Sequence, residues 1–233
     1  MLLLALDTSG KTGSAAVLED GRVLASKSFT VGLRHGREIM LRALETLDSA
    51  GRELREVSHV AAGLGPGSYT GIRVGVATAK TLAWALGAKL YGVPCADALA
   101  LNAPPEYARI AVAIDAKRGE VFGAVYEKRN GAFAAARACA VFKPEKLAEL
   151  AAAPVRKSGE KIRVCVLGDA AELYRGIFEK NGLEVLSEEF SAVRAENIGR
   201  LAEALPPEAD AFKLAPIYLR KSAAEEKYSK KPI

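Results

Sequence analysis

The most informative segment of this 233-residue chain reads Ala62-Gly63-Leu64-Gly65-Pro66-Gly67-Ser68-Tyr69-Thr70-Gly71-Ile72-Arg73. An apolar run over residues 59–63 precedes the glycines and predicts a buried strand. The Gly-Pro-Gly sequence interrupts regular structure, because proline fixes φ and glycine reaches backbone angles that other residues avoid. Ser68 or Thr70 can then cap a helix that ends at Gly87. The segment therefore predicts a strand, a glycine turn and a helix.

The glycine turn has two interpretations. A helix N-terminus behind such a turn presents N–H groups and a positive dipole end, so an anion could bind there. The turn could equally be structural. Its spacing differs from the phosphate loop, because Ile72 follows Gly71 where that loop has lysine, and it also differs from the G-x-G-x-x-G dinucleotide pattern. The sequence leaves both interpretations open.

Small residues recur at every fourth position of the predicted helix, at Gly71, Gly75, Ala79, Ala83 and Gly87. Residues four apart lie above one another on a helix, so these positions form one face. A face without bulky side chains lets another backbone approach closely. That backbone could belong to the protein's own sheet or to a second chain, and the residues alone do not decide between them.

The composition indicates an ordinary, mildly basic globular protein, with 50% hydrophobic residues, 26% charged residues and a formal charge of +5. No apolar run is long enough to span a membrane, and the residues before Asp7 are too few for a signal peptide. Three scattered cysteines (Cys95, Cys139 and Cys165) without a C-x-x-C motif predict core residues in a reducing cytoplasm. With only His35 and His59, a histidine-rich metal site is excluded.

The order of apolar runs and turns predicts two similar halves in an α/β fold. The first half has expected strands at 2–6, 14–18, 23–29, near 60 and at 89–93, with helices at 36–50 and up to 86. After a linker at 102–105, the second half has expected strands at 110–114, 121–127, 138–142 and 162–167, with helices at 143–152, 170–180 and 195–205. We therefore expect a first lobe over 1–103, a second lobe over 104–205 and a C-terminal segment with a basic tail over 206–233.

Two β-β-β-α-β-α units, each opening with a strand that ends in aspartate, resemble the actin-like (ASKHA, RNase H-like) fold of sugar kinases and heat-shock chaperones, built here around mixed five-stranded sheets. Five segments narrow the resemblance: Leu-Asp-Thr-Ser at 6–9, Gly-Pro-Gly-Ser-Tyr-Thr-Gly-Ile-Arg-Val-Gly at 65–75, Ala-Thr-Ala-Lys at 77–80, Ile-Asp-Ala-Lys-Arg-Gly-Glu-Val-Phe at 114–122 and Pro-Ile-Tyr-Leu-Arg at 216–220. Over nearly the whole chain they are similar to the TsaB family, also called YeaZ. Its members are needed to place threonylcarbamoyl on adenosine 37 of ANN-decoding tRNAs.

The resemblance implies a non-catalytic activator and scaffold rather than an enzyme. In that family the paralogue TsaD carries the metal and the catalytic step, and the ATPase TsaE completes the complex. We therefore expect a heterodimer with a TsaD-like protein, contact with tRNA only through the complex, no cofactor and no metal, with a homodimer of the isolated chain also open. Docking is expected through the first two helices, at Met40, Leu44, Gly71, Arg73, Gly75, Val76, Ala79, Lys80 and Ala83.

Two alternatives are a free-standing ATPase or kinase of this fold and, less favoured, a peptidase. Asp7 with its following hydroxyl residues suits a phosphate-binding hairpin, but Lys117 and Arg118 are bulky in the second hairpin. The lack of paired histidines argues against a peptidase. The basic residues of the C-terminal tail could contact tRNA phosphates or an acidic partner, or could form a solvated end: Arg220, Lys221, Lys227, Lys230 and Lys231.

Overall fold

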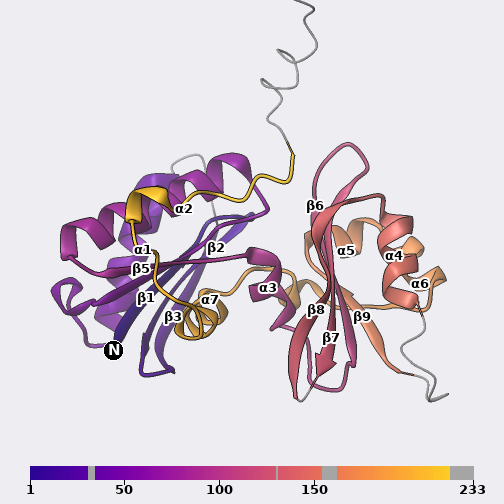
Figure 1. Cartoon of the computed structure of the whole chain (residues 1–233), viewed down its shortest axis with the longest axis horizontal. Coiled ribbons are helices and arrows are strands. Elements are labelled where there is room, and N and C mark those ends of the chain that lie inside the picture. The colour runs from indigo at the N-terminus through magenta and orange to yellow at the C-terminus, as the bar shows by residue number, and fades with distance from the viewer. Residues whose placement is uncertain (31–34, 130, 154–161, 221–233) are drawn as a thin grey trace, which may run out of the picture.

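The computed structural model describes residues 1–30, 35–129, 131–153 and 162–220, and it shows two lobes side by side (Figure 1). Each lobe has a five-stranded sheet, in the order β3-β2-β1-β4-β5 in the first and β10-β9-β6-β7-β8 in the second. The first lobe contains β1 (Leu2–Asp7), β2 (Thr12–Glu19), β3 (Arg22–Thr30), α1 (His35–Ser49), η1 (Leu54–Glu56), β4 (His59–Gly63), α2 (Tyr69–Leu86) and β5 (Lys89–Val93). The second contains β6 (Arg109–Asp115), β7 (Val121–Arg129), β8 (Ala132–Phe142), α4 (Pro144–Ala152), β9 (Val164–Leu167), α5 (Asp169–Leu173), α6 (Arg175–Lys180) and β10 (Glu184–Val185). The predicted α/β fold of two similar lobes is confirmed.

Strand β1 lies at the centre of the first sheet, and every residue of its apolar run is therefore buried. It pairs antiparallel with β2 and parallel with β4. Successive side chains of a strand point to opposite faces, so Leu4 and Leu6 pack in the layer that includes α1 and α2. Leu3 and Ala5 pack in the opposite layer. The strand thus anchors two hydrophobic layers at once.

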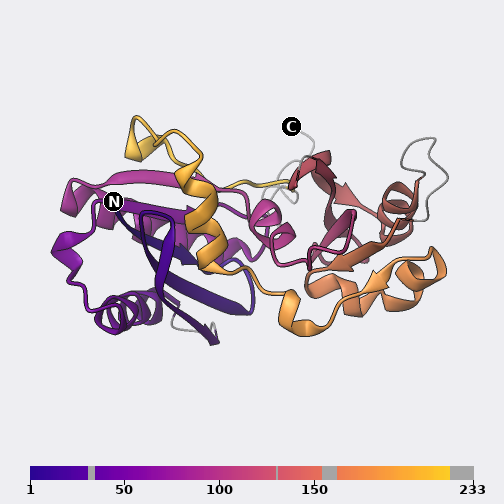
Figure 2. The same cartoon turned by 90° about the horizontal axis from the view of Figure 1, so that it is seen from below.

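Helix α7 (Ala195–Glu203) packs on the first lobe, although it follows the second lobe in sequence. It contacts β1, β2 and β4, and it lies across the first sheet in Figure 2. A Cβ at Gly199 would lie 2.4 Å from Cδ1 of Leu18, so a glycine lets helix and sheet meet closely. The prediction of a second lobe over 104–205 therefore placed this helix on the wrong sheet. Its amphipathic pattern shows that one face is buried but not which sheet covers it.

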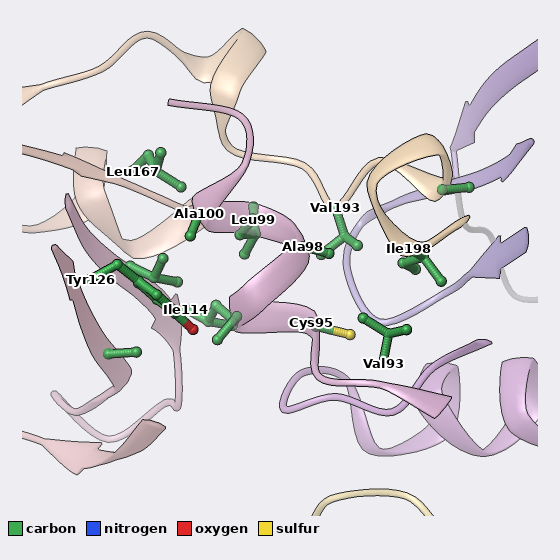
Figure 3. Packing of buried hydrophobic residues seen from close by; sticks show 14 of the residues in the cluster. Val93, Cys95, Ala98, Leu99, Ala100, Ile114, Tyr126, Leu167, Val193 and Ile198 are labelled. Atoms are coloured by element: carbon green, nitrogen blue, oxygen red, sulfur yellow. The ribbon is translucent and has the colours of Figure 1, made fainter. Parts of the chain in front are cut away.

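A short helix that the sequence analysis missed, α3 (Cys95–Ala100), lies between the lobes. Its buried side chains belong to one apolar cluster that extends from Val93 in the first lobe to Ile114 and Leu167 in the second (Figure 3). Six residues behind Pro94 are too few to show helical periodicity, which explains why the pattern was not recognised. The lobes consequently share one hydrophobic core.

The predicted linker at 102–105 is tied into this core. Asn102 is 6% exposed, and its Nδ2 donates to the carbonyls of Phe190 and Ala192 at 2.9 and 2.8 Å. Its Oδ1 accepts from Nδ2 of Asn197 on α7 at 2.8 Å. Buried amides with satisfied hydrogen bonds fix the geometry around them. The chain at this point is therefore a bonded junction rather than a loose connection.

Two further differences concern the second lobe. The helix predicted over 170–180 is two short helices, α5 and α6, separated at Tyr174, whose φ and ψ are −117° and 26°. The two-residue strand β10 pairs with β9 and was not predicted. A strand so short has no periodicity to detect.

No helix in the described ranges is long and apolar enough to cross a membrane.

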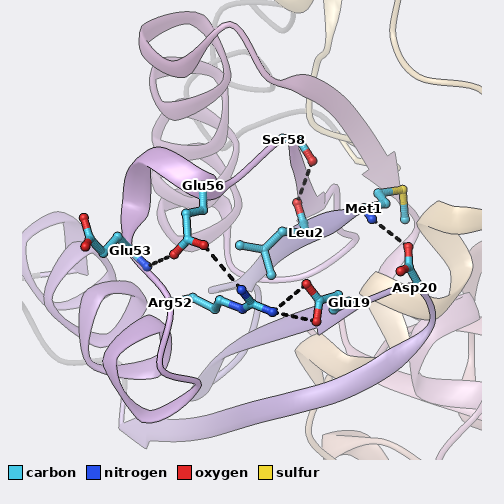
Figure 4. A network of polar contacts seen from close by, with 8 residues as sticks. All are labelled: Met1, Leu2, Glu19, Asp20, Arg52, Glu53, Glu56 and Ser58. Atoms are coloured by element: carbon cyan, nitrogen blue, oxygen red, sulfur yellow. Dashed lines mark hydrogen bonds and ion pairs between the residues drawn. The ribbon is translucent and has the colours of Figure 1, made fainter.

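A polar network closes one end of the first lobe (Figure 4). Nη2 of Arg52 donates to both carboxylate oxygens of Glu19 at 2.7 Å, and Nη1 contacts Glu56 at 3.4 Å. The N-terminal ammonium of Met1 contacts Asp20 at 2.6 Å. Because these groups are about one-quarter exposed or more, water screens each pair and its contribution to stability is small. The network fixes the loop after α1 against the end of β2.

The segment after α7 returns along the first lobe, where it forms η3 (Ala211–Lys213), and then reaches the second lobe. Nζ of Lys80 donates to the carbonyls of Phe212 and Leu214 at 2.8 and 3.1 Å. Ile217 N donates to the Leu64 carbonyl at 2.8 Å. The segment is thus bonded to the α2 side of the first lobe.

Arg220 is 20% exposed and donates to the Ala116 carbonyl at 2.6 Å and to the Glu120 carboxylate. It therefore joins the C-terminal segment to the second lobe. The prediction that Arg220 belongs to a basic tail is wrong, because its charge is already paired. The four lysines predicted beyond it, Lys221, Lys227, Lys230 and Lys231, lie outside the described residues.

Candidate functional site

The first hairpin turn, at the end of β1, satisfies its own polar groups. The Asp7 carboxylate is fully buried, and its Oδ2 accepts from the amide and hydroxyl of Ser9 at 3.1 and 2.9 Å. Its Oδ1 accepts from the Cys95 thiol at 3.5 Å. The Thr8 hydroxyl donates to the Gly71 carbonyl at 2.7 Å. These contacts leave the Asp7 carboxylate enclosed by protein.

Burial raises the pKa of the Asp7 carboxyl to about 6, because desolvation outweighs the hydrogen bonds from Ser9 and Cys95. In the unfolded chain the same carboxyl titrates near its usual value of about 4. Between these two pH values the folded protein holds a proton that the unfolded chain has released. The contribution of Asp7 to the free energy of unfolding therefore falls as the pH rises from about 4 to about 6.

We expect Asp7→Asn to gain stability relative to the native protein across that window. The neutral amide does not suffer the desolvation of a charge, so its advantage should grow by about 1–3 kcal/mol between pH 4 and pH 7. Urea unfolding of both proteins at a series of pH values measures the difference and cancels the other titrating groups. A difference that is constant with pH would show that the carboxyl is not shifted.

The second hairpin, at the end of β6, is held by its own lysine. The Lys117 amide donates to Oδ1 of Asp115 at 2.8 Å, and its Nζ contacts Oδ2 at 2.5 Å. Lys117 and Arg118 have φ values of 61° and 58°, a conformation that few residues other than glycine adopt. The Asp115 amide donates to Asp169 at 2.8 Å. Both oxygens of the Asp115 carboxylate are therefore engaged by Lys117.

A cleft of about 1040 Å³ lies between the two hairpins and the start of α2. Its lining includes the apolar side chains Leu99, Ile114, Phe122, Val193 and Leu219, and the charged side chains Lys11, Lys117, Asp115, Asp169 and Glu172. Charges of both signs therefore line this cleft. Within the described ranges no three His, Cys, Asp or Glu side chains are grouped so that they could hold a metal ion.

The glycine turn before α2 packs on the first hairpin. The Ser68 amide donates to the Ser9 carbonyl at 2.7 Å, and the Ser68 hydroxyl accepts from the Gly71 amide at 3.2 Å. Ser68, one of the two predicted candidates, is thus the N-cap, and Gly87, with φ of 63°, is the C-cap, as predicted. Two N–H groups at this helix start are already bonded within the protein, which favours the structural interpretation of the turn.

The small-residue ladder of α2 packs against the protein itself. A Cβ at Gly71 would lie 1.9 Å from the Thr8 carbonyl oxygen, and one at Gly75 would lie 2.7 Å from the Thr8 hydroxyl. Ala79 and Ala83 are at most 2% exposed. The prediction that this ladder faces a partner is therefore wrong. Its positions lack bulk because α2 crosses closely over the end of β1, and Val76 of the same predicted set is buried as well.

The opposite side of α2 is exposed, and it lies beside the exposed side of α1 (Figure 1). Trp84 is 71% exposed on α2, while Leu41 and Leu44 are 50% and 43% exposed on α1. Arg73, Ala77 and Thr81 are also exposed on α2. We call this surface the α1–α2 face, defined by Leu41, Leu44, Arg73, Ala77, Thr81 and Trp84. Of the predicted docking residues, Leu44 and Arg73 lie on it, whereas Met40 and Lys80 are half-buried.

Leu41 and Trp84 were missed by the sequence analysis, although their spacing carried a signal. Leu41 precedes Leu44 by three residues, and Trp84 follows Arg73 by eleven, about three helical turns. Leucines lie on two sides of α1, because Leu47 faces the core whereas Leu44 is exposed. A helix with leucines on two sides gives an ambiguous periodicity.

Each of the two sheets is mixed, and in each the first strand ends in an aspartate and pairs antiparallel with the second strand. Two lobes of this kind define a two-lobed actin-like protein. One solved structure of low identity supports that fold alone: component A of (R)-2-hydroxyglutaryl-CoA dehydratase from Acidaminococcus fermentans has a TM-score of 0.52 at 14% identity over 88% of this chain and 98% of that one. A profile described as "TsaD: tRNA N6-adenosine threonylcarbamoyltransferase" matches residues 30–228.

The chain belongs to the TsaB (YeaZ) family within that group. It is 30% identical to the tRNA threonylcarbamoyladenosine biosynthesis protein TsaB of Escherichia coli, over 97% of this chain and 98% of that protein. The match to the Bacillus subtilis protein of the same name is 34% identical but spans only 56% of this chain and 57% of that one. The solved YeaZ of Pseudomonas aeruginosa has a TM-score of 0.77 at 28% identity, over 94% of this chain and 99% of that one.

Proposed function

We propose that this protein is a non-catalytic activator of the complex that makes N6-threonylcarbamoyladenosine in tRNA, and that it docks onto a TsaD-like subunit through the α1–α2 face. The observation that carries the proposal is the exposure of Trp84, Leu41 and Leu44 on two adjacent helices. The process comes from its relatives in Escherichia coli and Bacillus subtilis, which are tRNA threonylcarbamoyladenosine biosynthesis proteins. Because this process acts on tRNA, it supports a cytoplasmic location for the protein.

An exposed apolar surface of this kind is typical of a docking site. Burying a tryptophan or leucine side chain that is otherwise exposed contributes about 1.5–3 kcal/mol, so three such residues favour association strongly. Tryptophan is also the residue type most often found at the energetic centre of an interface. Contiguous apolar patches on soluble proteins mark interaction sites more often than chance. The α1–α2 face therefore suits a partner that offers a similar helical surface.

Both hairpins support a non-catalytic role. The Asp7 carboxylate accepts three hydrogen bonds from Ser9 and Cys95 and is enclosed by them, so it has no open side for a metal-bound phosphate. In the second hairpin, both Asp115 oxygens are engaged by Lys117. An enzyme of the actin-like class needs groups of this kind to be available to nucleotide. These contacts favour a partner subunit over a free-standing ATPase or kinase.

The test is reconstitution with purified components. We expect this chain alone to show negligible ATP hydrolysis and no transfer of threonylcarbamoyl to an ANN-decoding tRNA. Transfer should appear when a TsaD-like subunit and a TsaE-like ATPase are added, measured as modified adenosine by mass spectrometry of digested tRNA. Steady phosphate release by the chain alone would instead support an ATPase, and cleavage of casein that survives chelators would support a peptidase. Robust transfer by the isolated chain would refute the proposal.

A further inference from the structure

Arg73 is held in a fixed orientation at the start of α2. Its Nε donates to the Tyr218 hydroxyl at 2.7 Å, and its Nη2 donates to the Tyr69 hydroxyl. The guanidinium carbon lies 4.0 Å from the centre of the Tyr69 ring and 5.6 Å from that of Tyr218. The two rings lie 5.0 Å apart. Two aromatic side chains, one from α2 and one from the C-terminal segment, thus position one exposed cation.

No carboxylate contacts this cation in the described part of the chain. Each of its recorded interactions is with a tyrosine. Helix α2 contains no Asp or Glu over Tyr69–Leu86, and its other cation, Lys80, is engaged by backbone carbonyls. A guanidinium has five N–H donors, of which two are used, so three remain for a ligand. Arg73 is therefore oriented but not neutralised.

We propose that Arg73 is a specificity-determining residue of the docking face, where it receives a carboxylate of the TsaD-like subunit. The inference rests on the proposed function, since it names the chemistry of the partner at the same surface. A planar guanidinium fits a carboxylate with two parallel hydrogen bonds. Because the tyrosines already fix the side chain, little conformational entropy is lost when the ion pair forms. The partner's facing surface should accordingly present an Asp or Glu within an apolar setting.

The surroundings of Arg73 favour a protein carboxylate over a tRNA phosphate. Arg73 shares one side of α2 with Ala77 and Trp84, an apolar surface of the kind found in protein interfaces. Surfaces that bind the phosphate backbone instead bring several lysines and arginines together. Here the neighbouring Lys80 is bonded to carbonyls of the C-terminal segment. In the described part of the chain, Arg73 is thus one oriented cation on the same side of α2 as exposed apolar residues, and this arrangement suits one carboxylate.

The experiment compares the dissociation constant of the purified TsaD-like subunit for four forms of this chain. Arg73→Gln removes the charge and is expected to weaken binding at least about 30-fold, with a smaller dependence of affinity on salt. Arg73→Lys keeps the charge but lacks the planar guanidinium that can form two parallel hydrogen bonds. Its affinity for the TsaD-like subunit should lie between those of Arg73→Gln and the native protein. Tyr218→Phe retains Arg73 but removes one orienting hydroxyl, so a loss of a few fold is expected. Thermal unfolding of each variant should match the native protein, since Arg73 is exposed.

Four results would each contradict the proposal that Arg73 receives a carboxylate of the TsaD-like subunit. Native affinity for Arg73→Gln, together with lost binding for Trp84→Glu, would overturn the carboxylate proposal and leave the docking face intact. Native affinity for both variants would overturn the docking face as well. If Arg73→Gln weakens tRNA binding by the assembled complex but not subunit affinity, the ligand is a phosphate and the proposal fails. If it changes only self-association of this chain by sedimentation, the carboxylate comes from a second copy and the proposal is likewise wrong.

Discussion

Replacing Trp84 by glutamate is expected to abolish binding to the TsaD-like subunit while the isolated protein unfolds at its native temperature. Trp84 is 71% exposed, so the substitution removes no core contact. In a docked complex the carboxylate would be buried among apolar groups without a partner, which is strongly unfavourable. Loss of an aromatic hot spot alone weakens binding by about 30- to 1000-fold. Gel filtration of the mixed subunits and thermal unfolding of the variant measure the two effects separately.

A matched control is available in the second lobe. Leu173 on α5 is 60% exposed, similar in degree to Trp84. Helix α5 belongs to the other lobe from α1 and α2 (Figure 1). Leu173→Glu therefore introduces the same charge on an exposed apolar residue and should leave subunit affinity unchanged. Equal losses for both variants would mean that charge or solubility, rather than the α1–α2 face, controls the interaction.

Unlike Trp84→Glu, which should leave the unfolding temperature unchanged, replacing Gly71 by alanine should destabilise the fold itself. The added Cβ would lie 1.9 Å from the Thr8 carbonyl oxygen, and this is backbone, which cannot turn away as a side chain could. Relief requires α2 to shift from the end of β1, so we expect a loss of about 1–3 kcal/mol in the free energy of unfolding. Chemical denaturation of the isolated chain is the measurement.

The control for this substitution is Gly176→Ala on α6. No heavy atom lies within 4 Å of a Cβ built at Gly176, and alanine favours a helix over glycine by about 1 kcal/mol. This variant should therefore be as stable as the native protein or slightly more so. Native stability of Gly71→Ala, combined with loss of binding to the partner, would show that the ladder faces outward after all.

Local sequence patterns were sufficient to place most strands and helices and the turns that separate them. The apolar run at 2–6 indicated a buried strand, and the glycine turn indicated a break between a strand and a helix that ends at Gly87, with Ser68 as one of two candidate caps. These assignments depend on local propensities that the chain carries with it. The five motifs at 6–9, 65–75, 77–80, 114–122 and 216–220 were also sufficient for the family, because together they follow the family's order along nearly the whole chain.

Which surface each helix buries depends on contacts between distant parts of the chain. A ladder of Gly71, Gly75, Ala79 and Ala83 establishes one close-packed face, but the same pattern serves a sheet of the same chain and a helix of another. Only the approach of Thr8 to this face shows that it is internal, which leaves Arg73 and Trp84 on the outside. The pairing of Arg220 with Glu120 and the return of α7 to the first lobe have the same origin. Contacts between residues a hundred or more positions apart leave no local pattern, so only the folded chain reveals them.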